Sequence, residues 1–307
     1  MANTNVKFSV IIPTYNREHL LVDALQSAYN ALPSGGEIIV VNDGTTFLHE
    51  TILIINKLGA SVTTTSGSTG AGAARNLGAE MAQGSWLLFL DDDDLISKDY
   101  WRAVQAYIDR ALPVETNAYG FCGSTSYLNR RAMKTAALGD IKINITHQDG
   151  PELKLKLAGF GLGFWVSKSL FKDIGGINPA LKTNEDLDFC LRLLSNQAQC
   201  HKSVDIGAFI FTGNHGSASA QSTTKRHNSK QRASYFKHII SFNSQIIGSD
   251  PKINHWLWQR YLKMGARSRD LASLRFLWAS QSLATSSKFI LSLYWGISFL
   301  LSIFHNY

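Results

Sequence analysis

The sequence predicts an α/β fold with a mostly parallel sheet over roughly its first hundred residues. Short runs dominated by large apolar residues, typical of strands buried on both faces, recur at Phe8–Ile12, Glu37–Val41 and Trp86–Leu90. Between these runs, apolar residues recur at helical spacing in Glu18–Asn30 and again over residues 47–58. Strands that alternate with helices in this way form right-handed units of a mostly parallel sheet.

The later part of the chain is less regular and then becomes helical. Strands are predicted at Asn117–Leu128, Asp140–Thr146 and Ala208–Phe211. A helix is predicted directly after the acidic segment Lys182–Asp188. From about Lys230 onward the pattern is that of consecutive helices, so the sequence predicts an α/β part followed by a helical extension.

Polar side chains stand at the predicted carboxyl ends of the strands, at Tyr15, Asp43 and the run Asp91–Asp94. In open α/β sheets ligands gather at this edge. Four adjacent carboxylates fixed to the end of a buried strand need a compensating charge, and a hard divalent cation bound together with phosphate oxygens supplies it. A solvated acidic loop is the alternative. The position directly after a core strand favours a metal–phosphate site.

The composition is that of a globular protein from a reducing compartment. Hydrophobic residues make up 45% and charged residues 17% of the 307 residues, which excludes wholesale disorder. The three cysteines, Cys122, Cys190 and Cys200, show no CxxC spacing and predict neither a disulfide framework nor a zinc site. The polar segment Met1–Lys7 leads directly into a strand and predicts no secretory signal, so the cytoplasm is the expected compartment.

Positive charge is concentrated near the end of the chain. Residues 225–307 contain 12 Lys and Arg against 2 acidic residues, whereas residues 1–224 contain 18 against 21. A basic region suits nucleic acid, an anionic membrane surface or an anionic substrate. Because the sequence shows no helix-turn-helix, zinc-finger or RNA-binding signature, a membrane is favoured over nucleic acid.

The last apolar segment, Phe289–Phe304, contains sixteen residues without a charge. It is shorter than the roughly twenty residues that span a bilayer, although Lys288 and His305 at its ends suit a short or tilted span. A core helix or an oligomer interface is the alternative. We expect the protein to be peripheral to, or anchored at, the inner face of the cell membrane.

Five motifs carry a resemblance to a known family, in its order and with its spacing. They are Ser9–Asn16 (SVIIPTYN), Ile39–Gly44 (IVVNDG), Gly70–Gly78 with Ala74-Arg75-Asn76, Leu90–Asp94 (LDDDD) and Asn184–Asp188 (NEDLD). Over about residues 1–217 the chain resembles the GT-A fold of the family 2 glycosyltransferases. The resemblance implies a GT-A domain at 1–224, with a nucleotide-binding half at 1–116 and an acceptor-side half at 117–224. A basic helical region at 225–307, with its apolar segment 289–304, follows.

The resemblance also implies an activity. Members of the family transfer a sugar from a nucleotide-diphosphate donor, here most simply a UDP-sugar, to an acceptor hydroxyl. The inverting members need a divalent cation, Mn²⁺ or Mg²⁺, because negative charge grows on the diphosphate as it leaves. The acceptor is expected to be a surface polysaccharide or a lipid-linked glycan.

By the same resemblance, Asp91 and Asp93 occupy the two positions of the family's D-x-D motif. Asp93 is the firmer metal ligand, while Asp91 reaches the metal or the ribose or sugar of the donor. Asp92 is assigned to the donor, and Asp94 is left undecided because a run of four aspartates leaves the reading frame of the motif open.

The donor base is expected to lie against the first two strand ends. Asp43 corresponds to the family aspartate that accepts a hydrogen bond from the base. Pro13, Thr14 and Tyr15 line the base pocket, Tyr15 by stacking. Arg75 corresponds to an arginine near the nucleotide, where a guanidinium suits phosphate oxygens. The alternatives are a turn-forming Asp43, a Tyr15 that packs a loop and a surface Arg75.

The catalytic residues implied by the resemblance lie far along the chain. Asp186 is the general base that takes the proton of the acceptor hydroxyl, and Glu185 contacts the acceptor or orients the base. Acidic residues that stabilise a helix N-terminus are the alternative reading. His215 stands where some members place a histidine near the metal or diphosphate; a structural or exposed histidine is the alternative.

The glycine-rich segment with Gly163, Phe164 and Trp165 lies where the family builds the acceptor side. The two rings stack on a sugar or belong to the core. Two other function classes remain open. A sugar nucleotidyltransferase would carry a glycine-rich basic loop after the first strand, where Pro13–Asn16 stands instead. A non-catalytic sugar- or membrane-binding protein with a degenerate site is the other.

Overall fold

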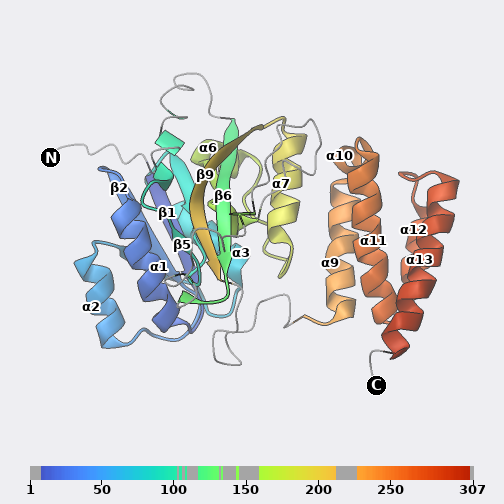
Figure 1. Ribbon diagram of the computed structural model, residues 1–307, viewed down its shortest axis with the longest axis horizontal. Helices are drawn as coiled ribbons and strands as arrows, with labels where there is room; N and C mark the ends of the chain where they lie inside the picture. The colour runs from blue at the N-terminus through green and yellow to red at the C-terminus, as the bar shows by residue number, and fades with distance from the viewer. Residues whose placement is uncertain are drawn as a thin grey trace. The chain divides into compact units, whose positions relative to one another are not determined.

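The computed structural model describes residues 8–101, 104–105, 108, 117–130, 133, 143–144, 159–211 and 227–304. By its internal contacts the chain divides into two compact units. The first, the α/β unit, comprises Met1–Asp149, Ala158–Ala180 and Asn196–Gln221. The second, the helical unit, comprises Gly150–Leu157, Leu181–Ser195 and Ser222–Tyr307. Figure 1 shows the elements of both.

The first half of the sheet is parallel, as the sequence predicts. Its strands are β1 (Phe8–Thr14), β2 (Gly36–Asn42), β3 (Ser61–Thr64) and β4 (Trp86–Phe89). β1 pairs with β2 and with β4, and β2 pairs with β3, all in parallel. Every residue of β1 and β4 is buried, because helices cover both faces. β1 continues one residue beyond Pro13, since the carbonyl of Thr14 still accepts a hydrogen bond from the Asp43 amide at 2.9 Å.

The second half of the sheet is mixed in direction. Its strands are β5 (Leu95–Ile96), β6 (Ala118–Tyr127), β7 (Ile143–Asn144), β8 (Trp165–Ser167) and β9 (Gln199–Phe211). The order across the sheet is β3-β2-β1-β4-β8-β6-β9-β5, with β7 attached to β6. β8 is antiparallel to both β4 and β6, whereas β6 and β9 are parallel. The sheet therefore changes direction at β4, the strand that the acidic run follows.

Two helices cover opposite faces of the parallel strands (Figure 1). α1 (Glu18–Ala31) buries its apolar stripe in the same core as Val10 and Ile12 of β1. α3 (Ala71–Met81) lies on the face of Ile11, because a Cβ on its Gly78 would collide with the Ile11 side chain. Successive strand residues point to opposite faces, so this alternation fixes the two layers. Further helical elements of this unit are α2 (His49–Lys57), η2 (Phe160–Leu162) and α6 (Lys168–Asp173).

The helical unit has its own hydrophobic core. Its helices are α7 (Glu185–Ser195), α9 (Ser229–Phe242), α10 (Ser244–Gly248), α11 (Pro251–Arg267), α12 (Ala272–Ala279) and α13 (Thr285–Phe304). The core is built around Trp258 of α11 and also takes in Leu181 and Leu191. α7 therefore packs with the C-terminal helices, so the division by contacts differs from the predicted boundary at residue 224.

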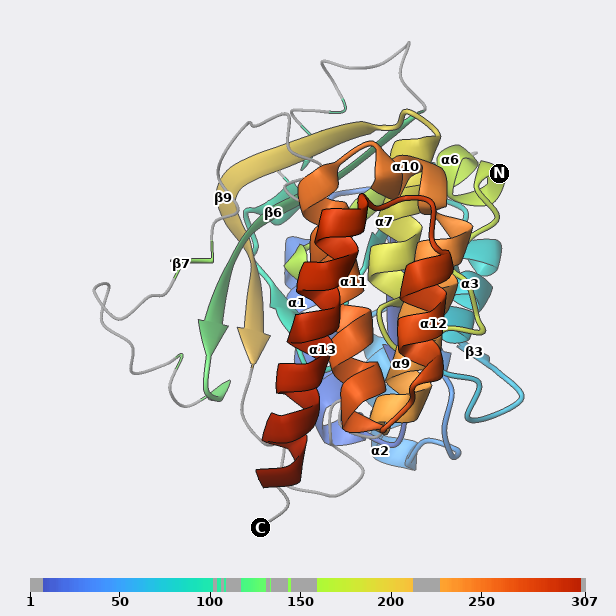
Figure 2. The ribbon, with the colours of Figure 1, turned by 90° about the vertical axis from the view of Figure 1, so that its right-hand side faces the viewer.

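One helix of this unit is long and apolar enough to cross a membrane by length and composition. It is Thr285–Ile303, with a mean hydropathy of 1.3, and 17% of this window is buried. The helix runs alongside α11 and α12 (Figure 2). Leu291 and Trp295 are buried on this side, and the Trp295 indole N–H donates to Ser273 Oγ at 2.9 Å.

Candidate active site

The ends of β1, β2 and β4 meet at one edge of the sheet. In the parallel register Thr14 stands opposite Asn42, and Ile11 stands opposite Phe89. The Leu90 amide then donates to the Ile11 carbonyl at 3.0 Å, which holds the start of the acidic run against β1. The structure thus brings the three predicted strand-end sites together within the α/β unit.

Three of the four consecutive aspartates form a cluster. Asp91, Asp93 and Asp94 each offer a carboxylate oxygen, and these oxygens lie within 4.8 Å of one another. The side chains of Asp91 and Asp93 are 31% and 23% exposed, so both remain open to solvent. Carboxylate oxygens are the ligands that Mg²⁺ and Mn²⁺ prefer, and the donor set therefore fits the expected cation.

Asp94, which the sequence left undecided, belongs to this cluster. It is buried, and its Oδ1 accepts a hydrogen bond from the Phe211 amide at 3.2 Å. Burial and the neighbouring charges of Asp91 and Asp93 raise the pKa of the Asp94 carboxyl well above its usual range. A cation bound at the cluster would reverse this effect by favouring the ionised form.

Asp92 points away from the cluster, and the structure gives it a role different from the predicted donor contact. The residue is 0% exposed and accepts a hydrogen bond from Thr14 Oγ1 at 2.7 Å. It is also ion-paired with Arg17. Burial raises the pKa of Asp92 to about 7, although Arg17 opposes the shift. Asp92 therefore ties the acidic run to the end of β1 and leaves no exposed oxygen for a donor.

Arginines compensate the acidic run in the α/β unit. Arg17 Nη1 lies 2.8 Å from Asp93 Oδ2, and Arg75, itself buried, is paired with Asp91. Arg130 Nη2 donates to the Asp93 carbonyl at 3.3 Å. Burial lowers the pKa of Arg17, but the charges of the neighbouring aspartates outweigh this and raise it. Arg17 and Arg130 were not predicted; for Arg17 the one sequence signal is its position directly after the first motif.

Asp43 organises the loop that leads into α3. Its carboxylate accepts hydrogen bonds from the Thr69 and Gly70 amides, both at 2.8 Å, and from the hydroxyls of Thr65 and Thr69. Burial raises the pKa of Asp43, but these hydrogen bonds outweigh it and the net shift is downward. Asp43 thus fixes the segment Thr65–Gly70 against the end of β2, a longer-range contact than the predicted local turn, and its lowered pKa favours the ionised carboxylate.

The other residues predicted for the base pocket differ in exposure. Pro13 and Thr14 are buried, and the Thr14 hydroxyl donates its hydrogen bond to Asp92. Tyr15 is half-buried, and its hydroxyl accepts from Ser68 Oγ at 3.2 Å. Of the three, Tyr15 alone presents part of its side chain to solvent.

The rings of the predicted acceptor side lie in the core. Phe164 is 0% exposed and packs against Phe89 and Phe160. Trp165 is also buried, with its ring 5.4 Å from that of Trp86. Of the two roles that the sequence leaves open for these rings, burial matches the core role. Gly163 adopts φ +60°, which favours glycine, and its carbonyl accepts from Tyr100 Oη at 2.9 Å.

Glu185 and Asp186 lie in the helical unit, in the first turn of α7. Both are half-buried, and Asp186 Oδ1 accepts from the Leu187 amide at 2.8 Å. Asn184, directly before the helix, adopts the left-handed conformation with φ +59°. His215 lies outside the described residues.

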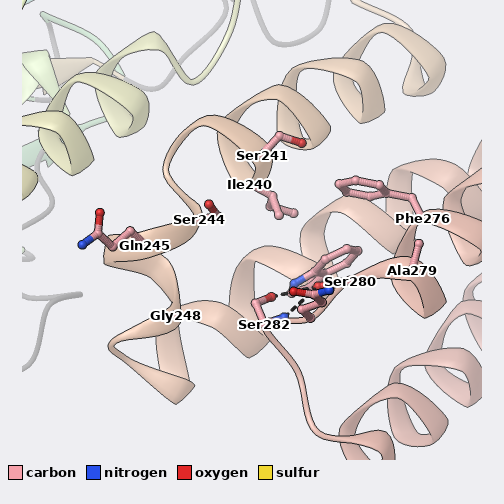
Figure 3. Close-up of a pocket in the computed structure, with 11 residues that line it drawn as sticks. Ile240, Ser241, Ser244, Gln245, Gly248, Phe276, Ala279, Ser280 and Ser282 are labelled. Atoms are coloured by element: carbon pink, nitrogen blue, oxygen red, sulfur yellow. Dashed lines mark hydrogen bonds between the residues drawn. The ribbon is translucent and has the colours of Figure 1, made fainter.

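A hollow of about 470 Å³ opens in the helical unit, lined by residues that include Ile240, Phe276, Ser244 and Ser280 (Figure 3). The hydroxyls of Ser280 and Ser282 are hydrogen-bonded to each other at 2.9 Å. None of the residues that line this hollow is among the predicted site residues.

Comparison with known proteins decides the family. Residues 9–175 match the model of glycosyl transferase family 2. The chain belongs to this family. An uncharacterized glycosyltransferase of Haemophilus influenzae is 29% identical over 197 residues, which are 61% of each chain. TarS of Staphylococcus aureus, a poly(ribitol-phosphate) β-N-acetylglucosaminyltransferase, is 38% identical over 111 residues. That match covers 34% of this chain and 19% of TarS.

Solved structures support the fold. The crystal structure of S. aureus TarS 1-349 in complex with UDP-GlcNAc superposes with a TM-score of 0.66 at 18% identity. The match covers 96% of this family 2 chain and 89% of the TarS fragment. The predicted GT-A fold with a helical C-terminal region is thereby confirmed.

Proposed function

We propose that this family 2 protein is an inverting glycosyltransferase that moves a sugar from a nucleotide-diphosphate donor, a UDP-sugar by preference, to an acceptor hydroxyl. The observation that carries the proposal is the carboxylate cluster of Asp91, Asp93 and Asp94 at the sheet edge where α/β folds bind ligands. A relative in fold has been crystallised with UDP-GlcNAc, which supports the preference for a UDP donor.

The chain supplies three kinds of group for this reaction. Asp91, Asp93 and Asp94 would hold Mn²⁺ or Mg²⁺, which when bound supplies positive charge beside the departing diphosphate. Arg75 and Arg17 add guanidinium groups at the same carboxylates and suit phosphate oxygens. Asp186 accepts the proton of the acceptor hydroxyl as that oxygen forms its bond to the anomeric carbon and the bond to the diphosphate breaks.

Thermal-shift measurements with UDP-, GDP- and dTDP-sugars, with and without Mn²⁺, test the donor site. A matching donor at a hundredfold excess over its Kd stabilises the folded state by about 2.7 kcal/mol. We expect the stabilisation to require Mn²⁺ and to be lost in Asp93→Asn. The exposed Asp99→Asn is the matched control. Equal stabilisation in the absence of metal, or in Asp93→Asn, would contradict the cluster as the metal site.

We further propose that the enzyme works at the inner membrane face on a surface glycan or lipid-linked acceptor, and that α13 makes the membrane contact. Six large apolar side chains of α13 are each at least 55% exposed: Phe289, Ile290, Leu293, Ile297, Leu300 and Leu301. At 100° per residue they fall within one third of the helix circumference, and we call them the outer stripe of α13. Trp278, 43% exposed with its ring 5.1 Å from that of Phe289, extends the stripe.

Packing of the opposite side of α13 favours an in-plane orientation over a span. Leu291 and Trp295 are buried, and a span would expose both to lipid and break the bond to Ser273. We expect the outer stripe of α13 to contact an anionic bilayer rather than a second copy of this chain. Residues 225–307 contain 12 basic and 2 acidic side chains, which attract anionic lipid and repel an identical surface.

Co-sedimentation with vesicles tests this surface. We expect binding to vesicles of phosphatidylglycerol and phosphatidylcholine, weaker binding to phosphatidylcholine alone, and a loss of roughly tenfold or more in Leu293→Asp/Ile297→Asp. Leu48→Asp, at a side chain 67% exposed in the α/β unit, is the control. A wild-type dimer in sedimentation velocity that the double variant dissociates, without vesicle binding, would assign the stripe to a second copy instead.

A further inference from the structure

The first turn of α7 carries a buried carboxylate beside the two half-buried ones. Asp188 is 0% exposed, and its amide donates to the Asn184 carbonyl at 3.2 Å, which closes the turn that contains Asp186. Asp188 therefore belongs to the same rigid turn as Asp186 but faces the interior of the helical unit.

Two donors hold the Asp188 carboxylate. Arg192, one turn along α7, donates from Nε to Oδ2 at 2.9 Å. Asn243 donates from Nδ2 to Oδ1, also at 2.9 Å. The bond from Arg192 lies within α7 and therefore does not itself join α7 to another element. The bond from Asn243, by contrast, ties this turn to another part of the unit.

Asn243 is itself fixed by two helices. It lies between α9 and α10, and it is 4% exposed. Its amide donates to the Ile239 carbonyl and its carbonyl accepts from the Ile247 amide, both at 3.0 Å. Its side chain also donates to the Ile239 carbonyl at 3.1 Å. The backbone and the side chain of Asn243 are thus fixed by α9 and α10 independently of the bond to Asp188.

Apolar packing alone does not set the rotation of α7. Leu191 shares a core with Ile239, Ile240 and Ile247, but such contacts are non-directional. A hydrogen bond to a buried carboxylate has a preferred direction and length, and a buried carboxylate is costly to leave partly unpaired. The Asn243–Asp188 bond is thus a buried, directional contact between the C-terminal helices and the first turn of α7.

We infer that Asn243 is a positioning residue that sets the orientation of Asp186 through Asp188, and that the C-terminal helices thereby belong to the catalytic apparatus. The inference rests on the proposed role of Asp186 as general base. It gives the helical extension, which lies beyond the matched family segment 9–175, a function in the transfer step in addition to membrane contact.

Hydrogen–deuterium exchange and transfer kinetics on the full chain test the inference together. In Asn243→Ala we expect the amides of residues 188–192 to exchange about tenfold faster or more, because local opening of α7 becomes easier. We expect kcat to fall roughly 10- to 100-fold with the donor KM within about twofold, since misplacing a catalytic group by about 1 Å has this effect.

Asn254→Ala is the matched control. Asn254 is also buried in the helical unit, and its Nδ2 donates to the Ser282 carbonyl at 2.7 Å, away from α7. The Asn254→Ala variant loses a buried side-chain hydrogen bond that does not involve α7. We expect its rate of amide exchange in α7 and its kcat to stay near those of the wild type.

The outcomes separate this inference from the proposed function. Unchanged exchange in α7, or a kcat no lower than that of Asn254→Ala, would overturn the positioning role. A fall in melting temperature alone, equal in the two variants, would do so as well. If the wild type transfers no sugar from any nucleotide donor, the proposed function fails, and without it Asn243 has no catalytic role.

Discussion

Asp92 in the α/β unit and Asp188 in the helical unit are both 0% exposed, yet they are held in different ways. Asp92 lies between two further aspartates of its own run, and both of its partners, Thr14 and Arg17, belong to the N-terminal segment. Asp188 pairs with Arg192 of its own helix and with the neutral Asn243. In each unit the buried carboxylate lies within two residues of a more accessible one proposed for chemistry. In both units, a buried carboxylate that supports the structure is thus divided from a more accessible neighbour proposed for the reaction.

The largest effect is expected where this division is tested directly, at Asp186. Asp186→Asn should lower transfer by about 10²–10⁴-fold, the usual contribution of a general base, while donor binding persists. Initial rates with saturating donor and a thermal shift with donor and Mn²⁺ measure the two properties. If Asp186→Asn transfers sugar at the wild-type rate, Asp186 has no part in the reaction.

The next effect sharpens the comparison of the two buried carboxylates. Arg17→Ala leaves Asp92 buried beside Asp91 and Asp93 without its cation, and should cost roughly 3–5 kcal/mol of unfolding free energy. Arg192→Ala should cost less, because Asp188 does not belong to a run of adjacent aspartates and keeps its hydrogen bond from the neutral Asn243. Urea denaturation of both variants gives the two free energies. Equal losses would show that the crowding of charge at the sheet edge is not what distinguishes Asp92.

The smallest effect concerns pH and compares Asp43 with Asp92, whose pKa values shift in opposite directions. The lowered pKa of Asp43 contributes stability that is present above its ordinary value of 3.8 and is lost as the pH falls through the folded-state value. Asp43→Asn should therefore weaken the loss of stability in acid and cost about 1–2 kcal/mol at neutral pH.

The raised pKa of Asp92 predicts a pH dependence of stability with the opposite sign. Because its folded-state pKa is raised to about 7, its contribution to stability declines as the pH rises from 3.8 toward 7. Asp92→Asn should flatten this decline. Melting temperatures of the two variants and the wild type, measured in metal-free buffer from pH 3 to 8, check both signs. Identical profiles for all three proteins would contradict both assignments.

Much of the α/β unit could be predicted from the sequence, because strands such as β1 and β4 are fully buried and α1 is amphipathic. The helix predicted at Glu18–Asn30 is α1, Glu18–Ala31, and the strand predicted at Asn117–Leu128 is β6, Ala118–Tyr127. β9 begins at Gln199, whereas a strand was predicted only from Ala208. Its first half is rich in polar residues, and its pairing with β6 is a tertiary contact that local pattern does not encode.

The site could be predicted only in part. The position of the acidic run follows from the strand before it, but the direction of each carboxylate depends on residues distant in the chain. Arg17 and Arg75 lie 75 and 16 positions from their partners Asp92 and Asp91. The hydrogen bond that joins α7 to the C-terminal helices likewise comes from Asn243, 55 positions from Asp188. No spacing rule in the sequence predicts such pairs, because the two partners come together only when the chain has folded.

The two ends of the strand order have a consequence for solubility. β3, with four residues, and β5, with two, are the outermost strands of the described sheet. β3 consists of Ser, Val, Thr and Thr, so its free edge is short and mostly hydroxylated. Short edges are poor templates for the addition of a strand from another chain. The β3 edge is therefore a poor site for fibrillar growth by strand addition.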